Sequence, residues 1–158
     1  MKVLGVDPST KLCGLAISLN DQLIDIDVWV GDPKDSVDRR LYDWDRWYGD
    51  YVRKVKPDLV VYEEVSYVRN MDTIRKLART EAVVIIQTKK LGIPVIEGKA
   101  TAARQISLGK GNIKKEDVLL LLKKRYSSLP WLSSNKGGMD QADAAVMALG
   151  GPTILERS

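Results

Sequence analysis

The sequence predicts an α/β fold in which helices cover both faces of a mixed β-sheet. In the first 30 residues, three runs with the pattern of β-strands are joined by short turns, as in an antiparallel meander. Further along, segments with the three- and four-residue apolar spacing of helices alternate with short apolar runs that fit buried parallel strands. Because the 158 residues contain no repeat and no long linker, we expect one domain, residues 1–158.

Each expected strand has a pattern of its own. Residues 2–7 (KVLGVD) and 13–19 (CGLAISL) are mostly apolar, whereas residues 22–30 alternate apolar and polar side chains, as in a half-exposed strand. Two short apolar runs complete the sheet, at residues 59–62 and 93–96. We therefore expect three antiparallel strands followed by two parallel ones.

Five helices are expected between and after these strands. The first follows Asp32-Pro33 and ends before Pro57. The last covers residues 139–149 and is expected to stop at Gly150-Gly151-Pro152, since glycine and proline commonly end helices. The other three are expected over residues 72–91, 99–107 and 114–126. The apolar stripe of residues 72–91 is wide, which indicates deep burial or a subunit contact.

Composition excludes several classes of function. The chain has no histidine, so a Ser-His-Asp triad, a Cys-His pair and histidine-ligated zinc are excluded. Carboxylates without imidazole favour a hard cation, Mg²⁺ or Mn²⁺. The one cysteine, Cys13, cannot form an internal disulfide, which favours a cytoplasmic location. No apolar run approaches the roughly 20 residues that span a bilayer, so we expect no membrane partner.

Basic residues are concentrated in one part of the chain. The net charge is +4, yet residues 99–125 hold eight basic and two acidic side chains, so the remaining residues are slightly acidic. A basic segment on a nearly neutral body indicates a polyanionic partner. The alternative is an ordinary solvated helix surface, because lysine-rich helix faces are common.

Four acids occupy positions where a negative charge is unfavourable. Asp7 and Glu63 each end an apolar strand, and Asp140 and Asp143 lie three residues apart on one face of the last helix. Burying such carboxylates requires a compensating charge. Two divalent cations about 4 Å apart, held by these four acids, would form a phosphodiester-cutting site. Without metal, mutual repulsion should raise the carboxyl pKa values. Asp140 alone also fits an ordinary first-turn acid.

These residues resemble the RuvC-type Holliday-junction resolvases, in order along nearly the whole chain. GVDPSTKLCGLAI resembles the first strand and turn of that family, with Asp7 as its first metal acid. DLVVYEEV resembles the strand that carries the catalytic glutamate, at Glu63, with Glu64 as the alternative. RNMDTIRKLARTEAV resembles the helix that follows, and DQADAAVMAL resembles the closing helix with Asp140 and Asp143.

The resemblance implies a ribonuclease H-like fold and a homodimer with two Mg²⁺ ions, or Mn²⁺, in each active site. It further implies that the dimer nicks two opposing strands of a four-way DNA junction symmetrically. ATAARQ and LGKGNIKKEDV resemble the DNA-facing region of the family. The residues expected to contact DNA there are Arg104, Lys110, Lys114 and Lys115.

The sequence departs from the family after the catalytic glutamate. Many members place an aromatic wedge residue three positions later, where this chain has Ser66. We expect Tyr67 to act as the wedge and Arg69 to contact a phosphate or stack on a base. The alternative is that Tyr67 packs on the domain surface, since neighbours on an extended segment point to opposite sides.

Three other functions fit parts of the sequence. GVDPST also resembles the phosphate-contacting turn of actin-like sugar kinases, although the chain is too short for two lobes. An RNA-processing nuclease of the same fold is an alternative, because a metal site does not distinguish the sugar. A catalytically silent junction-binding relative is a third, although all four acids are present. The partner helicase, if any, is unknown.

Overall fold

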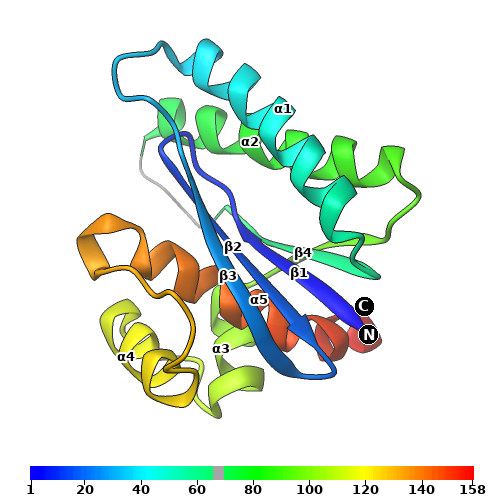
Figure 1. Ribbon diagram of the computed structural model, residues 1–158, viewed down its shortest axis with the longest axis vertical. Helices are drawn as coiled ribbons and strands as arrows, with labels where there is room; N and C mark the ends of the chain where they lie inside the picture. Colours follow the sequence, from blue (N-terminus) through cyan, green and yellow to red (C-terminus); the bar gives the residue numbers. More distant parts are fainter. Residues whose placement is uncertain (66–69) are drawn as a thin grey trace.

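A mixed five-stranded sheet forms the centre of the protein, in the order β3-β2-β1-β4-β5 (Figure 1). The computed structural model describes residues 1–65 and 70–158. β1 pairs antiparallel with β2 and parallel with β4, while β2–β3 is antiparallel and β4–β5 parallel, which confirms the predicted mixed sheet. The strands are β1 (Lys2–Asp7), β2 (Leu12–Leu19), β3 (Gln22–Val30), β4 (Leu59–Glu63) and β5 (Val95–Gly98).

The fifth strand begins two residues later than expected. Residues 93–96 were the predicted range, whereas pairing starts at Val95, opposite Val60. Pro94 has no N–H to donate to the ladder. Its carbonyl nevertheless accepts the Val60 N–H at 3.0 Å, so this residue only leads into the strand.

Helices cover both faces of the sheet, as predicted (Figure 1). Two helices lie on one face, with Trp44, Tyr48 and Val84 packed on Leu4 and Val6. The other face is covered by the last helix, residues 138–157. The helices at residues 100–108 and 115–125 pack on the outside of that helix. The elements are α1 (Val37–Val55), α2 (Met71–Lys90), α3 (Ala100–Leu108), α4 (Lys115–Arg125), the short 3₁₀ helix η1 (Ser134–Lys136) and α5 (Gly138–Arg157). Among the described residues, no helix combines the length and apolar character needed to cross a bilayer.

The predicted end of the last helix was wrong. α5 continues through Gly150-Gly151-Pro152 and ends at Arg157. Pro152 cannot donate to the carbonyl four residues earlier, that of Ala148. The Ser18 hydroxyl on β2 donates to that carbonyl at 2.9 Å, so the missing helical hydrogen bond is replaced from the sheet. This compensation comes from a residue far away in the sequence, and the local pattern gave no sign of it.

Glycines let α5 approach the sheet closely. A Cβ at Gly5 would lie 2.0 Å from the Ala144 carbonyl oxygen, and one at Gly14 would lie 2.0 Å from the Asp140 carbonyl oxygen. Both distances are far inside van der Waals contact. The glycines on β1 and β2 therefore set the distance between the sheet and the N-terminal half of α5.

Candidate active site

Strand alternation turns Asp7 and Glu63 toward α5. Along β1, Leu4 and Val6 pack under α1 and α2, whereas Val3 packs on the α5 side. Since side chains alternate, Asp7 points to the same side as Val3. On β4 the same rule places Glu63 with Leu59 and Val61, on the α5 side.

The alternative glutamate, Glu64, lies beyond the end of β4. It borders a cavity of about 510 Å³ that is also lined by Ile96 of β5 and Ile154 of α5. The geometry therefore favours Glu63, the first choice from the sequence, over its neighbour.

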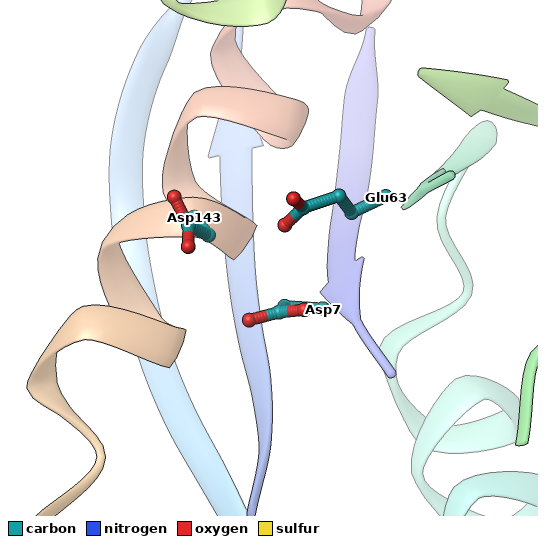
Figure 2. A group of neighbouring side chains, drawn as sticks. All are labelled: Asp7, Glu63 and Asp143. Atoms are coloured by element: carbon teal, nitrogen blue, oxygen red, sulfur yellow. The ribbon is translucent and has the colours of Figure 1, made fainter. Parts of the chain in front are cut away.

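Three acids from three elements meet at the C-terminal ends of β1 and β4 (Figure 2). Val6 and Tyr62 are partners in the parallel ladder, so the residues after them, Asp7 and Glu63, lie side by side. Asp143 approaches from α5 and is only 1% exposed. One carboxylate oxygen from each of Asp7, Glu63 and Asp143 lies within 4.8 Å of the other two.

Burial and neighbouring negative charges raise the pKa of two of these carboxylates, Asp7 and Glu63, as the sequence predicted for the metal-free site. Burial, and then the Asp143 charge, raise the pKa of Glu63 to about 7. Burial, followed by the charges of Glu63, Asp143 and Asp140, raises the pKa of Asp7 well above its usual range. Near neutral pH the metal-free site therefore holds protons that a bound cation would displace.

Two basic side chains partly neutralise Asp143. The Arg104 guanidinium on α3 donates to Asp143 Oδ1 at 2.9 Å and to the Ile113 carbonyl at 3.3 Å. The Lys115 ammonium at the start of α4 lies 2.7 Å from Asp143 Oδ2. Burial lowers the pKa of Lys115, but the carboxylates of Asp143, Glu63 and Asp7 together outweigh this effect and the pKa is raised overall. One buried carboxylate thus links the start of α4 to α3 and α5.

The donor set fits a hard divalent cation. Among the described residues, the buried Glu63 Oε2 has no hydrogen-bond partner, and the buried Asp143 Oδ2 is met by the Lys115 ammonium. A buried oxygen like that of Glu63 is unfavourable unless something binds it. Carboxylate oxygens are the ligands that Mg²⁺ and Mn²⁺ prefer. The cluster of Asp7, Glu63 and Asp143 is therefore a candidate metal site.

Asp140 lies next to this cluster rather than within it. It sits about one turn before Asp143 on α5, and its backbone carbonyl abuts Gly14. Burial raises the pKa of Asp140, and its charge in turn raises that of Asp7. The Asp140 side chain does not belong to the group of Asp7, Glu63 and Asp143, whose oxygens lie within 4.8 Å of one another. Its part in metal binding therefore stays a prediction.

The residues expected to contact DNA lie in different surroundings. Lys110 and Lys114 are exposed, so they are free to meet a phosphate. Arg104 is 8% exposed and reaches Asp143, and Lys115 also points into the acidic site. Tyr67 and Arg69 lie outside the described residues. The pairing of Arg104 and Lys115 with Asp143 was not foreseen, because the sequence separates these residues by 39 and 28 positions.

Comparisons with known proteins agree with this geometry. The family model described as crossover junction endodeoxyribonuclease RuvC matches residues 3–150. A protein of that name from Syntrophomonas wolfei is 30% identical over 128 residues, which covers 78% of this chain and 74% of the relative.

Solved structures show the same fold. The structure of Thermus thermophilus RuvC superposes with a TM-score of 0.78 at 21% identity, covering 99% of this chain and 96% of that one. T. thermophilus RuvC in complex with a Holliday junction substrate gives a TM-score of 0.80 at 20% identity, covering 100% and 97%. These two structures confirm the expected ribonuclease H-like fold. The match to the family model over residues 3–150 favours the nuclease interpretation over the sugar kinase.

Proposed function

The chain belongs to the RuvC family of crossover junction endodeoxyribonucleases, and from this premise we propose that it resolves four-way DNA junctions by metal-dependent, paired symmetric nicks. The observation that carries the proposal is the meeting of Asp7, Glu63 and Asp143, with a buried Glu63 oxygen that has no hydrogen-bond partner among the described residues. A structure of a relative bound to a Holliday junction supports the choice of substrate.

Asp7, Glu63 and Asp143 would hold the cation, with Asp140 beside them. We propose two Mg²⁺ ions for each site, with Mn²⁺ as a substitute. When bound, they would supply activation of water and stabilisation of the charge on the leaving oxygen. Arg104 fixes the orientation of the Asp143 carboxylate from α3.

Lys115 adds a positive charge at the same carboxylate. Its side chain is about half exposed while its ammonium contacts Asp143, so it is placed to meet a substrate phosphate. Lysine acts there as a point charge on a flexible stem, able to exchange one anionic partner for another. Lys115 can therefore form its ion pair with Asp143 in the free protein and contact a DNA phosphate in the complex.

DNA contacts outside the site are proposed at Lys110 and Lys114. Both are exposed in the segment between α3 and α4, close in sequence to Lys115. Phosphate contacts of this kind position a duplex and carry no sequence information. The proposed wedge at Tyr67 and contact at Arg69 remain part of the same hypothesis.

The proposed homodimer is supported by the outer face of α2. This helix packs inward through Thr80, Val84 and Thr88. Its opposite side exposes Ala78, Ala82 and Ile86, the last at 53%. A two-fold dimer through such a face would give one active site for each of two strands. A cytoplasmic location is part of the proposal and rests on the single cysteine.

A substrate panel tests the function. The protein is incubated with a four-way junction, a fork, a duplex and an RNA–DNA hybrid, with and without Mg²⁺. We expect paired nicks in the junction that require Mg²⁺ and are lowered by orders of magnitude in Asp7→Asn, Glu63→Gln, Asp140→Asn and Asp143→Asn. Junction binding should survive in these variants. Preferential cutting of the hybrid would favour the RNA-processing alternative, and binding without any cutting would favour the silent relative.

A further inference from the structure

We propose that Glu81 on α2 is a positioning residue of the nuclease site, because its carboxylate holds the chain where it leaves β4, two residues after Glu63. This inference rests on the proposed function and deepens it. The contact that carries it is a hydrogen bond from the Val65 backbone N–H to Glu81 Oε1, at 2.9 Å.

The bond lies where strand pairing ends. The ladder between β1 and β4 stops at Tyr62, and that between β4 and β5 stops at Glu63. The Glu64 N–H still donates to the Gly98 carbonyl at 3.0 Å, but β5 then gives way to α3. For the next N–H, that of Val65, the acceptor is a side chain. Glu81 thus holds the chain one residue beyond the last backbone bond to β5, at Glu64.

Glu81 is itself held on a firmly packed turn. The preceding residue, Thr80, is fully buried, and its carbonyl accepts the Trp44 indole N–H of α1 at 3.3 Å. In the last turn of α2, the Thr88 hydroxyl pairs with the Tyr48 hydroxyl at 2.9 Å. α1 and α2 therefore form a fixed support, from which Glu81 reaches the sheet.

The surroundings of Glu81 make a purely electrostatic role unfavourable. Burial raises its pKa, the Val65 N–H lowers it, and the nearby carboxylates of Glu97 and Glu64 raise it further. An acid that is half-buried beside two other acids gains stability chiefly from accepting the backbone N–H. The acceptor oxygen, rather than the negative charge, is the property that the position requires.

The direction of the Glu63 side chain depends on how the chain is held just after β4. Glu63 is the last residue of β4. Among the described residues that follow it, the backbone bonds of Glu64 and Val65 hold the chain in place. If the chain frays at Val65, Glu63 can turn or withdraw from Asp7 and Asp143. Displacements of about 1 Å in a catalytic group lower rates by roughly a hundredfold. Partners that orient metal ligands typically contribute 10–100-fold.

The test compares Glu81→Ala, which removes the acceptor, with Glu81→Gln, which keeps an amide oxygen at the same place. Glu97→Ala is the matched control, since it removes a nearby charge and leaves the Val65 bond intact. Single-turnover junction cleavage is measured over a range of Mg²⁺ concentrations, with junction binding measured in EDTA. Hydrogen exchange of the Val65 amide and Mn²⁺ binding are measured without DNA.

We expect Glu81→Ala to lower the cleavage rate about 10–100-fold, to raise the Mg²⁺ concentration at half-maximal rate, and to speed Val65 exchange, with junction binding unchanged. Glu81→Gln and Glu97→Ala should behave as wild type. Wild-type cleavage and Mg²⁺ dependence in Glu81→Ala, or equal impairment in Glu81→Gln, would overturn the proposal. If the wild-type protein cuts no junction, the proposed function fails, whereas Val65 exchange and Mn²⁺ affinity still decide the role of Glu81.

Discussion

Replacing Gly14 by alanine should damage the active site through the backbone alone. Gly14 lies on β2 directly opposite Asp7 in the antiparallel ladder, and beneath the first turn of α5. A Cβ there would lie 2.0 Å from the Asp140 carbonyl oxygen, 2.3 Å from the Asp140 carbonyl carbon and 2.9 Å from the Gln141 nitrogen. All three atoms belong to the helix backbone, so no side chain can rotate away.

The size of the effect follows from these distances. Cβ atoms essentially never approach other heavy atoms within 3.0 Å, so α5 must retreat by about 1 Å or more at Asp140. Asp143 lies on the same helix, one turn on, and moves with it. Such a displacement predicts a loss of roughly a hundredfold in cleavage rate. Overpacking should lower the free energy of unfolding by about 1–3 kcal/mol.

The assay is single-turnover junction cleavage in Mg²⁺, together with urea unfolding. Gly150→Ala is the matched control, because the nearest described atom to a Cβ there, the Ala103 Cα, lies 3.4 Å away. Gly150 lies within α5, where alanine should stabilise by up to about 1 kcal/mol. A Gly14→Ala protein with wild-type cleavage and stability would refute the reasoning that this glycine sets the spacing of the acids.

Three further predictions follow from the charges. Folding raises the pKa of Glu63 from 4.5 to about 7, so the free energy of unfolding of the metal-free protein should fall as pH rises from 4.5 through 7, by about 3 kcal/mol for this group. Unfolding in EDTA at pH 5 and pH 8 measures this loss, and Mg²⁺ should reverse it. Greater stability at pH 8 than at pH 5 would contradict the prediction. Arg104→Met should lower the free energy of unfolding in EDTA by about 3 kcal/mol, because Lys115 is then the one basic partner left of the two that contact the buried Asp143 carboxylate. A change below about 0.5 kcal/mol, the size expected of a surface substitution, would count against this prediction. The Lys110→Ala/Lys114→Ala double variant should bind junctions more weakly. The slope of log binding constant against log salt concentration, measured between 50 and 200 mM salt, should become shallower by about 1.8. An unchanged slope would mean that neither lysine contacts DNA.

Local patterns in the sequence predicted most of the elements and the choice of acids. Apolar alternation and helical spacing depend on neighbouring residues, so the strands of the meander and the start of α5 were found within a residue or two. The same alternation explains why Glu63, in phase with Val61, faces α5. A charged residue that ends an apolar strand is a local signal of the site, and it identified Asp7 and Glu63.

What could not be predicted depends on contacts between distant segments. α5 continues past Pro152 because Ser18, on β2, supplies the missing hydrogen bond. Arg104 belongs by sequence to a basic segment, yet in the fold it is buried against Asp143. Neither partner lies within one turn or one hairpin of the residue that it serves. Sequence patterning therefore located the residues of the candidate site without revealing which of them neutralise one another.

The central claim is that Asp7, Glu63 and Asp143 hold the divalent cation on which cleavage depends. The most direct measurement is Mn²⁺ binding to the free protein at pH 7.5, monitored by electron paramagnetic resonance, for wild type, Asp7→Asn and Asp38→Asn. The last is the control, because it changes an exposed acid in the first turn of α1. We expect saturable Mn²⁺ binding by wild type and by Asp38→Asn, and its loss in Asp7→Asn. Equal Mn²⁺ affinity in all three proteins would contradict the central claim.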